Sequence, residues 1–197
     1  MNTYLCEKTH SGASLTPLET ACFDRGVLFL DGSITEETAT RFIQNGMVLA
    51  LKEIPMTVVI NTNGGDLQAG LNIYDFLTSM PHVTTVAVKA YSMGSLLFAA
   101  GGKRIMFPHS QLMIHEPLLA SGVSGSCSSV ETMADVLKSK REQMAALFSK
   151  HTGKAAEEFL EIMRKDTYFN AEEAMALGLC DAVETWDSIL RNEVKHV

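Results

Sequence analysis

The fold is decided by residues 58–94, which read VVINTNGGDLQAGLNIYDFLTSMPHVTTVAVKAYSMG. Two short apolar runs, Val58–Ile60 and Val86–Val88, each end in a glycine-bearing turn, and a helical pattern of apolar residues follows each turn. Successive strand-turn-helix units with apolar strands predict neighbouring parallel strands, whose turns lie at the same edge of a sheet, where such folds bind ligands. We therefore expect the turn at Asn61–Gly65 to lie beside the turn at Ala90–Gly94.

The same alternation continues on both sides of this stretch. The apolar patterns predict strands at 26–30, 57–61, 84–90, 104–107, 112–114 and 180–183, and helices at 35–54, 67–80, 93–100, 128–150, 154–164 and 170–178. This order predicts an α/β fold of repeated β-α crossovers with a parallel sheet core covered by helices. We expect an N-terminal arm at 1–25 and a single domain at 26–197. The helix at 128–150 is too long for a small core alone, which suggests a contact between subunits.

Composition excludes several classes of protein. The chain has 197 residues, is 46% hydrophobic and carries a net charge of -7, with 16 scattered Lys and Arg residues. Binding to nucleic acid requires clustered basic residues, so no nucleic-acid partner is expected. The apolar runs are too short for a membrane-spanning helix, and we expect a cytoplasmic protein. The four cysteines are widely spaced and lack histidines at ligand spacing, which predicts free thiols and no zinc site.

Each part of a serine-dependent site has a candidate. A serine hydroxyl needs an imidazole base, a group that orients this base, and hydrogen-bond donors for the oxyanion. Ser92 begins a helix, where backbone N–H groups are free, although a serine here is equally suited to cap the helix. Gly64–Gly65 exposes backbone N–H groups to a substrate carbonyl, or simply forms a tight turn.

His115 is the candidate base, because it ends a strand immediately after the parallel run. Asp166, which follows the helix at 154–164, is the candidate orienting group. Other histidines and carboxylates compete for these roles: His10, His82, His109, His151 and His196 as the base, and Asp66 and Asp75 as the orienting acid. Spacing alone leaves these alternatives open.

Taken together, the residues from about Gly26 to Ala182 resemble a known family, the proteolytic subunit of the Clp protease (ClpP). The resemblance is carried by Ile60–Asn61, Gly64–Gly65, Ala69–Gly70, Ile73–Asp75, Tyr91–Ser95, Met113–Pro117, His151–Gly153, Asp166, Asn170–Ala174 and Gly178–Leu179. It implies a ClpP/crotonase-like fold and a serine endopeptidase that acts on unfolded proteins and short peptides. It also implies that no metal or organic cofactor is needed.

The resemblance further implies a role for each site residue. Ser92 is expected as the nucleophile, His115 as the general base and Asp166 as its orienting group, with the N–H groups of Gly65 and Met93 as the oxyanion hole. The substrate-binding residues implied are Gly64, Ser121, Gly122 and Val123, the last three within an extended strand at 118–126.

The expected partners follow from the same resemblance. Polypeptide substrates are one expected partner. Further copies of the chain are another, in heptameric rings or a tetradecamer, or in mixed rings with a paralogue. The third is a Clp/Hsp100-type AAA+ unfoldase. The helix at 128–150 is expected as a protruding handle that joins the rings. A catalytically silent structural subunit that assembles with an active paralogue, and a crotonase-type acyl-CoA enzyme, are the alternative functions.

The chain departs from the family pattern at several positions. Thr62–Asn63 replaces serine-proline, Glu116 replaces glutamine, and Leu118–Ala120 replaces a glycine pair. Thr57 and Val59 stand where tyrosines line the ATPase docking pocket, and Arg164–Lys165 stands where an Asp-Arg pair makes ring contacts. These differences predict a divergent member with its own cleavage preference.

Overall fold

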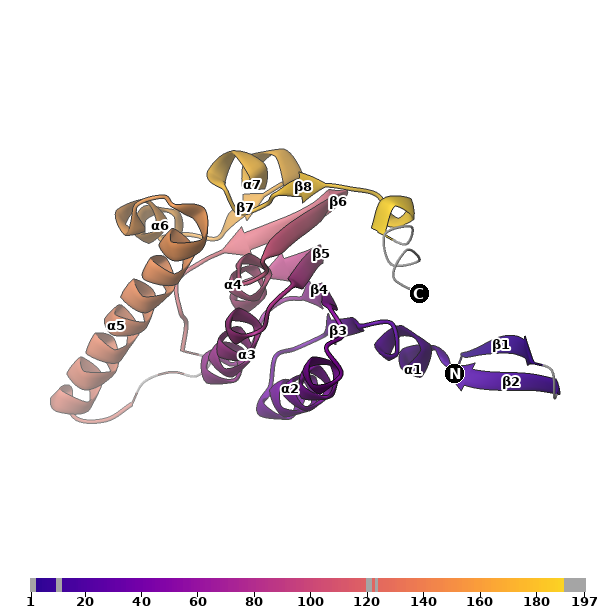
Figure 1. Cartoon of the computed structure of the whole chain (residues 1–197). Coiled ribbons are helices and arrows are strands. Elements are labelled where there is room, and N and C mark those ends of the chain that lie inside the picture. The colour runs from indigo at the N-terminus through magenta and orange to yellow at the C-terminus, as the bar shows by residue number, and fades with distance from the viewer. Residues whose placement is uncertain (1–2, 10–11, 120–121, 123, 190–197) are drawn as a thin grey trace.

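The computed structural model describes residues 3–9, 12–119, 122 and 124–189, and Figure 1 shows how its elements are arranged. A six-stranded sheet in the order β3-β4-β5-β6-β7, with β8 beside β6, forms the centre. Its strands are β3 (Val27–Asp31), β4 (Met56–Thr62), β5 (Val83–Tyr91), β6 (Lys103–Ile114), β7 (Thr167–Phe169) and β8 (Ala182–Val183). Every pairing is parallel except that of β6 with β7. The expected α/β fold is therefore confirmed, with a mixed, mostly parallel sheet.

The central strand β4 is buried on both faces of the sheet. Helices α2 (Glu36–Leu51), α3 (Leu67–Ser79) and α4 (Met93–Ala99) lie along one face (Figure 1). In β4, Val58 and Ile60 belong to the main core that these helices share. Val59, between them, belongs to a smaller cluster on the other face, together with residues that include Ile189. Burial on both sides explains why the strand is an unbroken apolar run.

Side-chain caps explain where two helices begin. Thr35 precedes α2, and its hydroxyl accepts a hydrogen bond from the N–H of Thr38, whose own hydroxyl accepts one from the N–H of Thr35. Asn170 and Glu173 make the same reciprocal pair at the start of α7 (Ala171–Leu177). Both satisfy N–H groups that a helix leaves free at its first turn. The two helix starts expected from the sequence are confirmed.

Helix α5 (Cys127–Thr152) extends away from the rest of the chain, and the shorter α6 (Ala156–Ile162) follows it (Figure 1). Only three residues of α5 are buried, Met144, Ala145 and Phe148, and all lie toward its C-terminal end. The long helix expected at 128–150 is confirmed with slightly wider bounds. Among the described residues, no core packs against its N-terminal part.

The structure corrects the sequence prediction at β6 and β7. We expected separate strands at 104–107 and 112–114, but β6 is continuous through Pro108. The pairing register between β5 and β6 shifts after Ala87, so residues 107–110 of β6 form a bulge. Pro108 lies in this bulge, where its missing N–H removes no hydrogen bond between the strands. The strand β7 was not foreseen, because three residues are too few to show an alternating pattern.

The expected N-terminal arm contains a hairpin of β1 (Tyr4–Thr9) and β2 (Gly12–Pro17), followed by α1 (Leu18–Phe23). Among the described strands, those of the hairpin pair with each other and with no other strand, and most side chains of β2 are exposed. In Figure 1 the hairpin lies apart from the central sheet. This secondary structure was not foreseen, and the division at residue 25 stays a prediction. Within the described ranges, no helix has both the length and the apolar character needed to cross a membrane.

Candidate active site

Ser92 lies on a strained turn between β5 and α4. Its backbone has φ 55 and ψ -122, a region that residues other than glycine rarely adopt and that is found mainly at functional sites. Its N–H donates a hydrogen bond of 2.8 Å to the carbonyl oxygen of Met113 in β6. Its side chain makes no hydrogen bond to the helix, so the capping role considered from the sequence is wrong. The hydroxyl is available for another partner.

That partner is His115, which directly follows β6. Its Nε2 lies 2.7 Å from Ser92 Oγ, within hydrogen-bond distance. Its Nδ1 lies 3.6 Å from Oδ1 of Asp166, a contact longer than a hydrogen bond. Pairing of Ile114 with Thr167 across β6 and β7 brings Asp166 beside the histidine. The structure therefore brings together the three residues selected from the sequence.

The competing residues lie elsewhere. His109 falls in the bulge of β6, and His82 precedes β5 in a turn with φ 57. The ring of His151 bonds instead to the hydroxyl of Tyr74, with Nε2 2.7 Å from the oxygen. Two carboxylates have other places: Asp66 caps α3 through Ala69, and Asp75 lies on the same helix. His10 and His196 lie outside the described residues.

The two glycine-bearing turns meet, as expected. A Cβ atom on Gly64 would lie 2.7 Å from Cβ of Ser92, closer than real side chains approach, so only glycine fits. Gly65 pairs with Ile34, whose N–H bonds to the carbonyl of Gly64 and whose carbonyl accepts from Asp66. In the part of the chain that is described, the N–H groups of Gly65 and Met93 donate no backbone hydrogen bond of their own. Both remain available to a ligand.

Thr62 supports these turns, a role that the sequence did not reveal. Its hydroxyl donates a hydrogen bond of 2.5 Å to the carbonyl of Gly32 and accepts one of 2.9 Å from the N–H of Gly64. A Cβ atom on Gly94 would lie 2.4 Å from the methyl carbon of Thr62. Threonine thus holds the first turn and packs against the second. The signal available beforehand was only its departure from the usual serine.

The segment after His115 is tied to two helices. The N–H of Glu116 donates to the carbonyl of Met163, and Oε2 of Glu116 lies 3.4 Å from Nη1 of Arg141 on α5. Leu118 is exposed, and Gly122 has open space where a side chain would be. Ser121 and Val123, also expected to bind substrate, lie outside the described residues.

Metal-binding side chains do not cluster in this region. Across the described residues, no group of three or more His, Cys, Asp or Glu side chains is placed to hold a metal ion. All four cysteines are free thiols.

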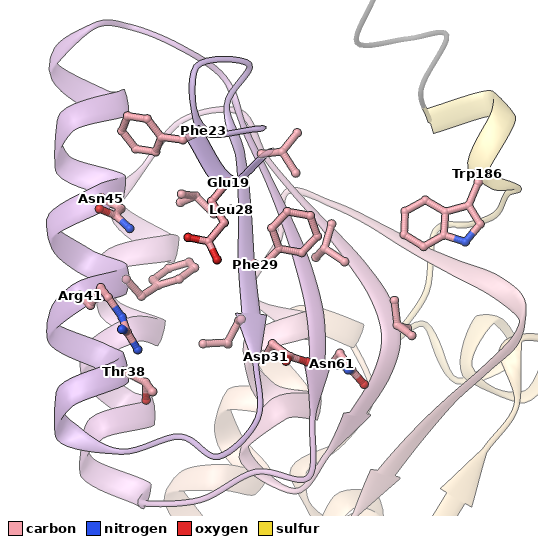
Figure 2. Close-up of a pocket in the computed structure, with 15 residues that line it drawn as sticks. Glu19, Phe23, Leu28, Phe29, Asp31, Thr38, Arg41, Asn45, Asn61 and Trp186 are labelled. Atoms are coloured by element: carbon pink, nitrogen blue, oxygen red, sulfur yellow. Dashed lines mark hydrogen bonds between the residues drawn. The ribbon is translucent and has the colours of Figure 1, made fainter. Parts of the chain in front are cut away.

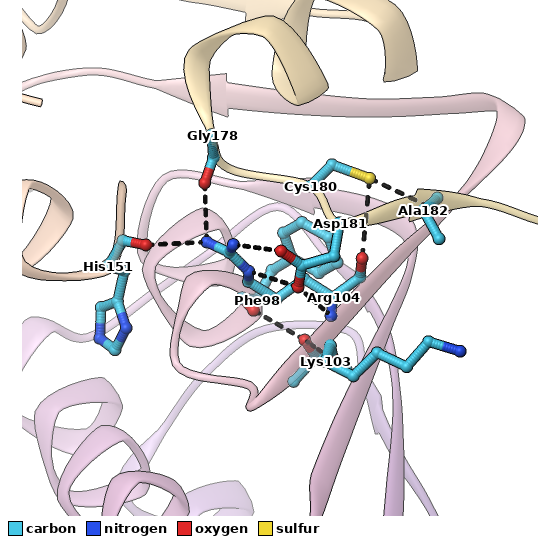
Figure 3. Close-up of polar contacts among 9 residues, drawn as sticks. Phe98, Lys103, Arg104, His151, Gly178, Cys180, Asp181 and Ala182 are labelled. Carbon is cyan, nitrogen blue, oxygen red and sulfur yellow. Dashed lines mark hydrogen bonds and ion pairs between the residues drawn. The ribbon is translucent and has the colours of Figure 1, made fainter. Parts of the chain in front are cut away.

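A second polar cluster surrounds Arg104, near the start of β6 and so at the opposite end of this strand from His115 (Figure 3). The guanidinium binds both carboxylate oxygens of Asp181 and the carbonyl oxygens of Gly178 and His151. Burial alone raises the pKa of Asp181, but the hydrogen bonds and charge of Arg104 outweigh it, and the net pKa lies below the ordinary value. These contacts join the ends of α5 and α7 to the sheet, which is a structural role.

An open cavity of 630 Å³ lies between β3, β4 and α2 (Figure 2), and Ser92 is not among the residues that line it. One part of its lining is apolar and includes Phe29, Val59, Val88 and Trp186. The other part is polar and includes Asp31, Thr38, Arg41, Asn45 and Asn61. Thr57 and Val59 stand where the family resemblance places tyrosines of the ATPase docking pocket. Val59 lines this cavity, whereas Thr57 is buried and is not part of the lining.

A serine on a strained turn, a histidine within hydrogen-bond distance and a carboxylate behind it have the geometry that serine hydrolases use. The comparisons with known proteins agree with this class. Residues 11–186 match the Clp protease family. The chain is 34% identical over 165 residues to the ATP-dependent Clp protease proteolytic subunit 2 of Thermobifida fusca (strain YX), covering 81% of this chain and 80% of that protein. The chain belongs to the ClpP family of Clp protease proteolytic subunits, which confirms the resemblance seen in its sequence.

Proposed function

We propose that this chain is an active serine endopeptidase in which Ser92 is the nucleophile. The observation that carries the proposal is the 2.7 Å contact between Ser92 Oγ and His115 Nε2. In the reaction, Nε2 takes the hydroxyl proton as Oγ attacks the peptide carbonyl, and then gives this proton to the leaving amine. Asp166 orients the ring from the Nδ1 side and stabilises its positive charge.

The oxyanion is stabilised, in this proposal, by the N–H groups of Gly65 and Met93. They lie on the two turns that meet at Ser92, and donors fixed in advance in this way stabilise the charge that develops on the carbonyl oxygen. Gly64 lets the substrate backbone approach, because it carries no side chain. We place the bound peptide along residues 118–126, with Ser121, Gly122 and Val123 as its partners.

Turnover of a fluorogenic peptide and labelling by a fluorophosphonate test this proposal. Ser92→Ala is expected to lower turnover by about 10³-fold or more and to abolish the label. His115→Ala is expected to have a similar effect, whereas the matched change His109→Ala, in the bulge of the same strand, leaves both readouts near wild type. Unchanged turnover in Ser92→Ala would show that another residue carries the chemistry.

We also propose that the chain works in rings and receives substrates from a Clp/Hsp100-type AAA+ unfoldase. The relative from Thermobifida fusca is named a subunit of an ATP-dependent protease. The cavity supports the proposal, because it contains Val59, at a position where the family resemblance places the docking pocket. Phe29→Asp, in the exposed lining, is expected to stop unfoldase-dependent degradation of a folded protein and to spare short-peptide turnover. Equal loss of both activities would argue against docking at this cavity.

A silent subunit that assembles with an active paralogue is the second candidate. It is favoured by the 3.6 Å separation of His115 from Asp166, whose side chain is 61% exposed, because a carboxylate held this loosely orients the ring poorly. Labelling of Ser92 only after mixing with a paralogue would support a site that assembly completes. No labelling under either condition would favour the silent subunit. Saturable binding of an acyl-CoA at this site would instead favour the crotonase-type alternative.

A further inference from the structure

Ser95 lies at the centre of the turn that carries the proposed nucleophile. It is in the first turn of α4 and is fully buried, although its neighbours in the helix are apolar. Its hydroxyl oxygen lies 2.7 Å from the carbonyl oxygen of Ala90 and 2.7 Å from that of Met113. Ala90 belongs to β5 and Met113 to β6, so one side chain connects two strands. A hydroxyl carries one proton, so Ser95 shares this proton between the two carbonyl oxygens or donates it to one of them at a time, and either arrangement restrains the buried turn.

The two strands that Ser95 connects carry the two reacting side chains. Ala90 lies two residues before Ser92, and Met113 lies two residues before His115. The distance between Ser92 Oγ and His115 Nε2 therefore depends on how the end of β5 sits against the end of β6. The hydroxyl of Ser95 lies within hydrogen-bond distance of a carbonyl oxygen at each of these two ends.

Ser95 also holds the strained backbone of Ser92. The N–H of Ser95 donates a hydrogen bond of 3.0 Å to the carbonyl of Ser92. The hydroxyl of Ser95 binds the same Met113 carbonyl that accepts the N–H of Ser92. A conformation with positive φ persists only when its surroundings enforce it, and these contacts supply part of that enforcement.

We propose that Ser95 is a positioning residue, whose hydroxyl sets the geometry of the Ser92–His115 pair. The inference rests on the proposed peptidase function. Misplacement of a reacting group by about 1 Å can lower the rate of a reaction by about 100-fold, while substrate binding depends on other contacts. Loss of the hydroxyl should therefore lower kcat and leave KM nearly unchanged.

Ser110 provides a matched control, because it is also a buried serine that connects β5 to β6. Its hydroxyl donates to the carbonyl of Ala87 at 2.5 Å and accepts from the N–H of Phe107, within the bulge. Removal of either hydroxyl disturbs the pairing of the same two strands. Only Ser95 contacts the turn of the nucleophile, so a purely structural role predicts the same result for both variants.

The experiment measures kcat, KM, the fluorophosphonate labelling rate and the free energy of unfolding for the wild type, Ser92→Ala, Ser95→Ala, Ser95→Cys and Ser110→Ala. We expect both Ser95 variants to lower kcat and the labelling rate by about 10- to 100-fold and to keep KM within about threefold of the wild-type value. Alanine has no hydrogen-bond donor at this position, and the thiol of cysteine is a weak one. Ser110→Ala is expected to keep kcat within about twofold while it loses stability. Activity is expressed per folded molecule, and Ser95→Cys serves as the test if Ser95→Ala does not fold.

A kcat within about twofold of wild type in a folded Ser95 variant would overturn the inference. An equal loss of kcat in the Ser95 and Ser110 variants would overturn it as well, because it would reduce the effect to strand pairing. If Ser92→Ala keeps its turnover, the proposed function itself fails. If Ser92→Ala loses its turnover and the Ser95 variants keep the wild-type kcat, the positioning role of Ser95 is excluded and the proposed function stands.

Discussion

His151 links the burial of one side chain to the pH dependence of stability. Burial, and to a lesser extent the charges of Lys150 and Arg104, lower the pKa of His151 from 6.5 to about 4. Burial and the nearby charge of Asp75 raise the pKa of Tyr74, so its hydroxyl stays protonated. A neutral imidazole that carries its proton on Nδ1 accepts a hydrogen bond from this hydroxyl at Nε2, across 2.7 Å. A charged imidazole has no lone pair to accept it.

Acidification should therefore destabilise the folded chain before the carboxylates titrate. Between pH 6.5 and about 4 the unfolded chain binds a proton at His151 that the folded chain does not bind. The contribution of His151 to the free energy of unfolding is therefore fully present above pH 6.5 and is lost as the pH falls from 6.5 to about 4. The loss is at most roughly 3 kcal/mol. Urea unfolding at pH 7.5 and pH 5 measures it. In His151→Asn this part of the pH dependence should disappear, and an identical pH dependence in the two proteins would contradict the assignment.

Asp181 provides an internal comparison, because its pKa is lowered from 3.8. Its contribution to stability is present above pH 3.8 and is lost as the pH falls through its folded pKa. The two residues therefore act in different pH ranges.

Thr62 combines a hydroxyl and a methyl group, and the two can be separated by substitution. Thr62→Val removes the hydroxyl and leaves the carbonyl of Gly32 and the N–H of Gly64 without this partner. We expect a loss of about 1–3 kcal/mol in the free energy of unfolding and a marked fall in kcat, because the first glycine turn loosens. Thr62→Ser keeps the hydroxyl and should cost about 1 kcal/mol, with kcat nearly preserved. Chemical denaturation and peptide turnover measure both, and an equal kcat in the two variants would argue against a role for the hydroxyl.

Among the elements, the end of α5 depends on one glycine. Gly153 has φ 72, a left-handed conformation, and a Cβ atom there would meet no other atom within 4 Å. Backbone strain is therefore the only cost of adding a side chain. Gly153→Ala should lower the free energy of unfolding by about 1 kcal/mol. Thermal or urea unfolding tests this against Gly102→Ala, which has no positive φ and should be neutral or slightly stabilising. Similar losses at both positions would show that the strain is not decisive.

The elements that could be predicted are those whose signals are local. Burial on both faces makes β4 a continuous apolar run, and caps such as Thr35 and Asn170 mark helix starts in the sequence itself. The strand β7 could not be found in this way, because its three residues become a strand only by pairing with β6. Pro108 misled the prediction of β6 because the bulge that accommodates it arises from pairing with β5.

In the candidate site, too, residues with a local signal could be predicted from the sequence, and residues whose role depends on distant partners could not. Ser92 and His115 are candidates because few residue types serve as nucleophile and base and the ends of parallel strands lie at one sheet edge. The family resemblance then distinguishes His115 from the competing histidines. Thr62 and Ser95 could not be predicted, since their partners are carbonyl oxygens of Gly32, Ala90 and Met113 on other segments. Any serine or threonine has a hydroxyl, and only the fold shows which carbonyl it reaches.

For the whole molecule, α5 exposes an apolar surface that the described part of the chain does not cover. Val130, Met133 and Val136 lie at spacings that share one side of the helix, and each is at least 38% exposed. Exposed apolar residues that gather on one surface commonly mark a protein contact, and this agrees with the proposed rings. The structure thus predicts that copies of α5 contribute to assembly.

The double variant Met133→Asp with Val136→Glu tests this surface. A charge on each side chain would have to lose its water on assembly, so we expect particles of lower mass than those of the wild type, because α5 is the expected contact between rings. Peptide turnover per chain should fall with the mass, while circular dichroism stays unchanged because both positions are exposed. The control is Lys138→Ala, which removes only an exposed ion pair with Asp135 and should leave the assembly intact. Light scattering after size-exclusion chromatography gives the masses, and a double variant with the mass of the wild type would exclude this side of α5 from the interface.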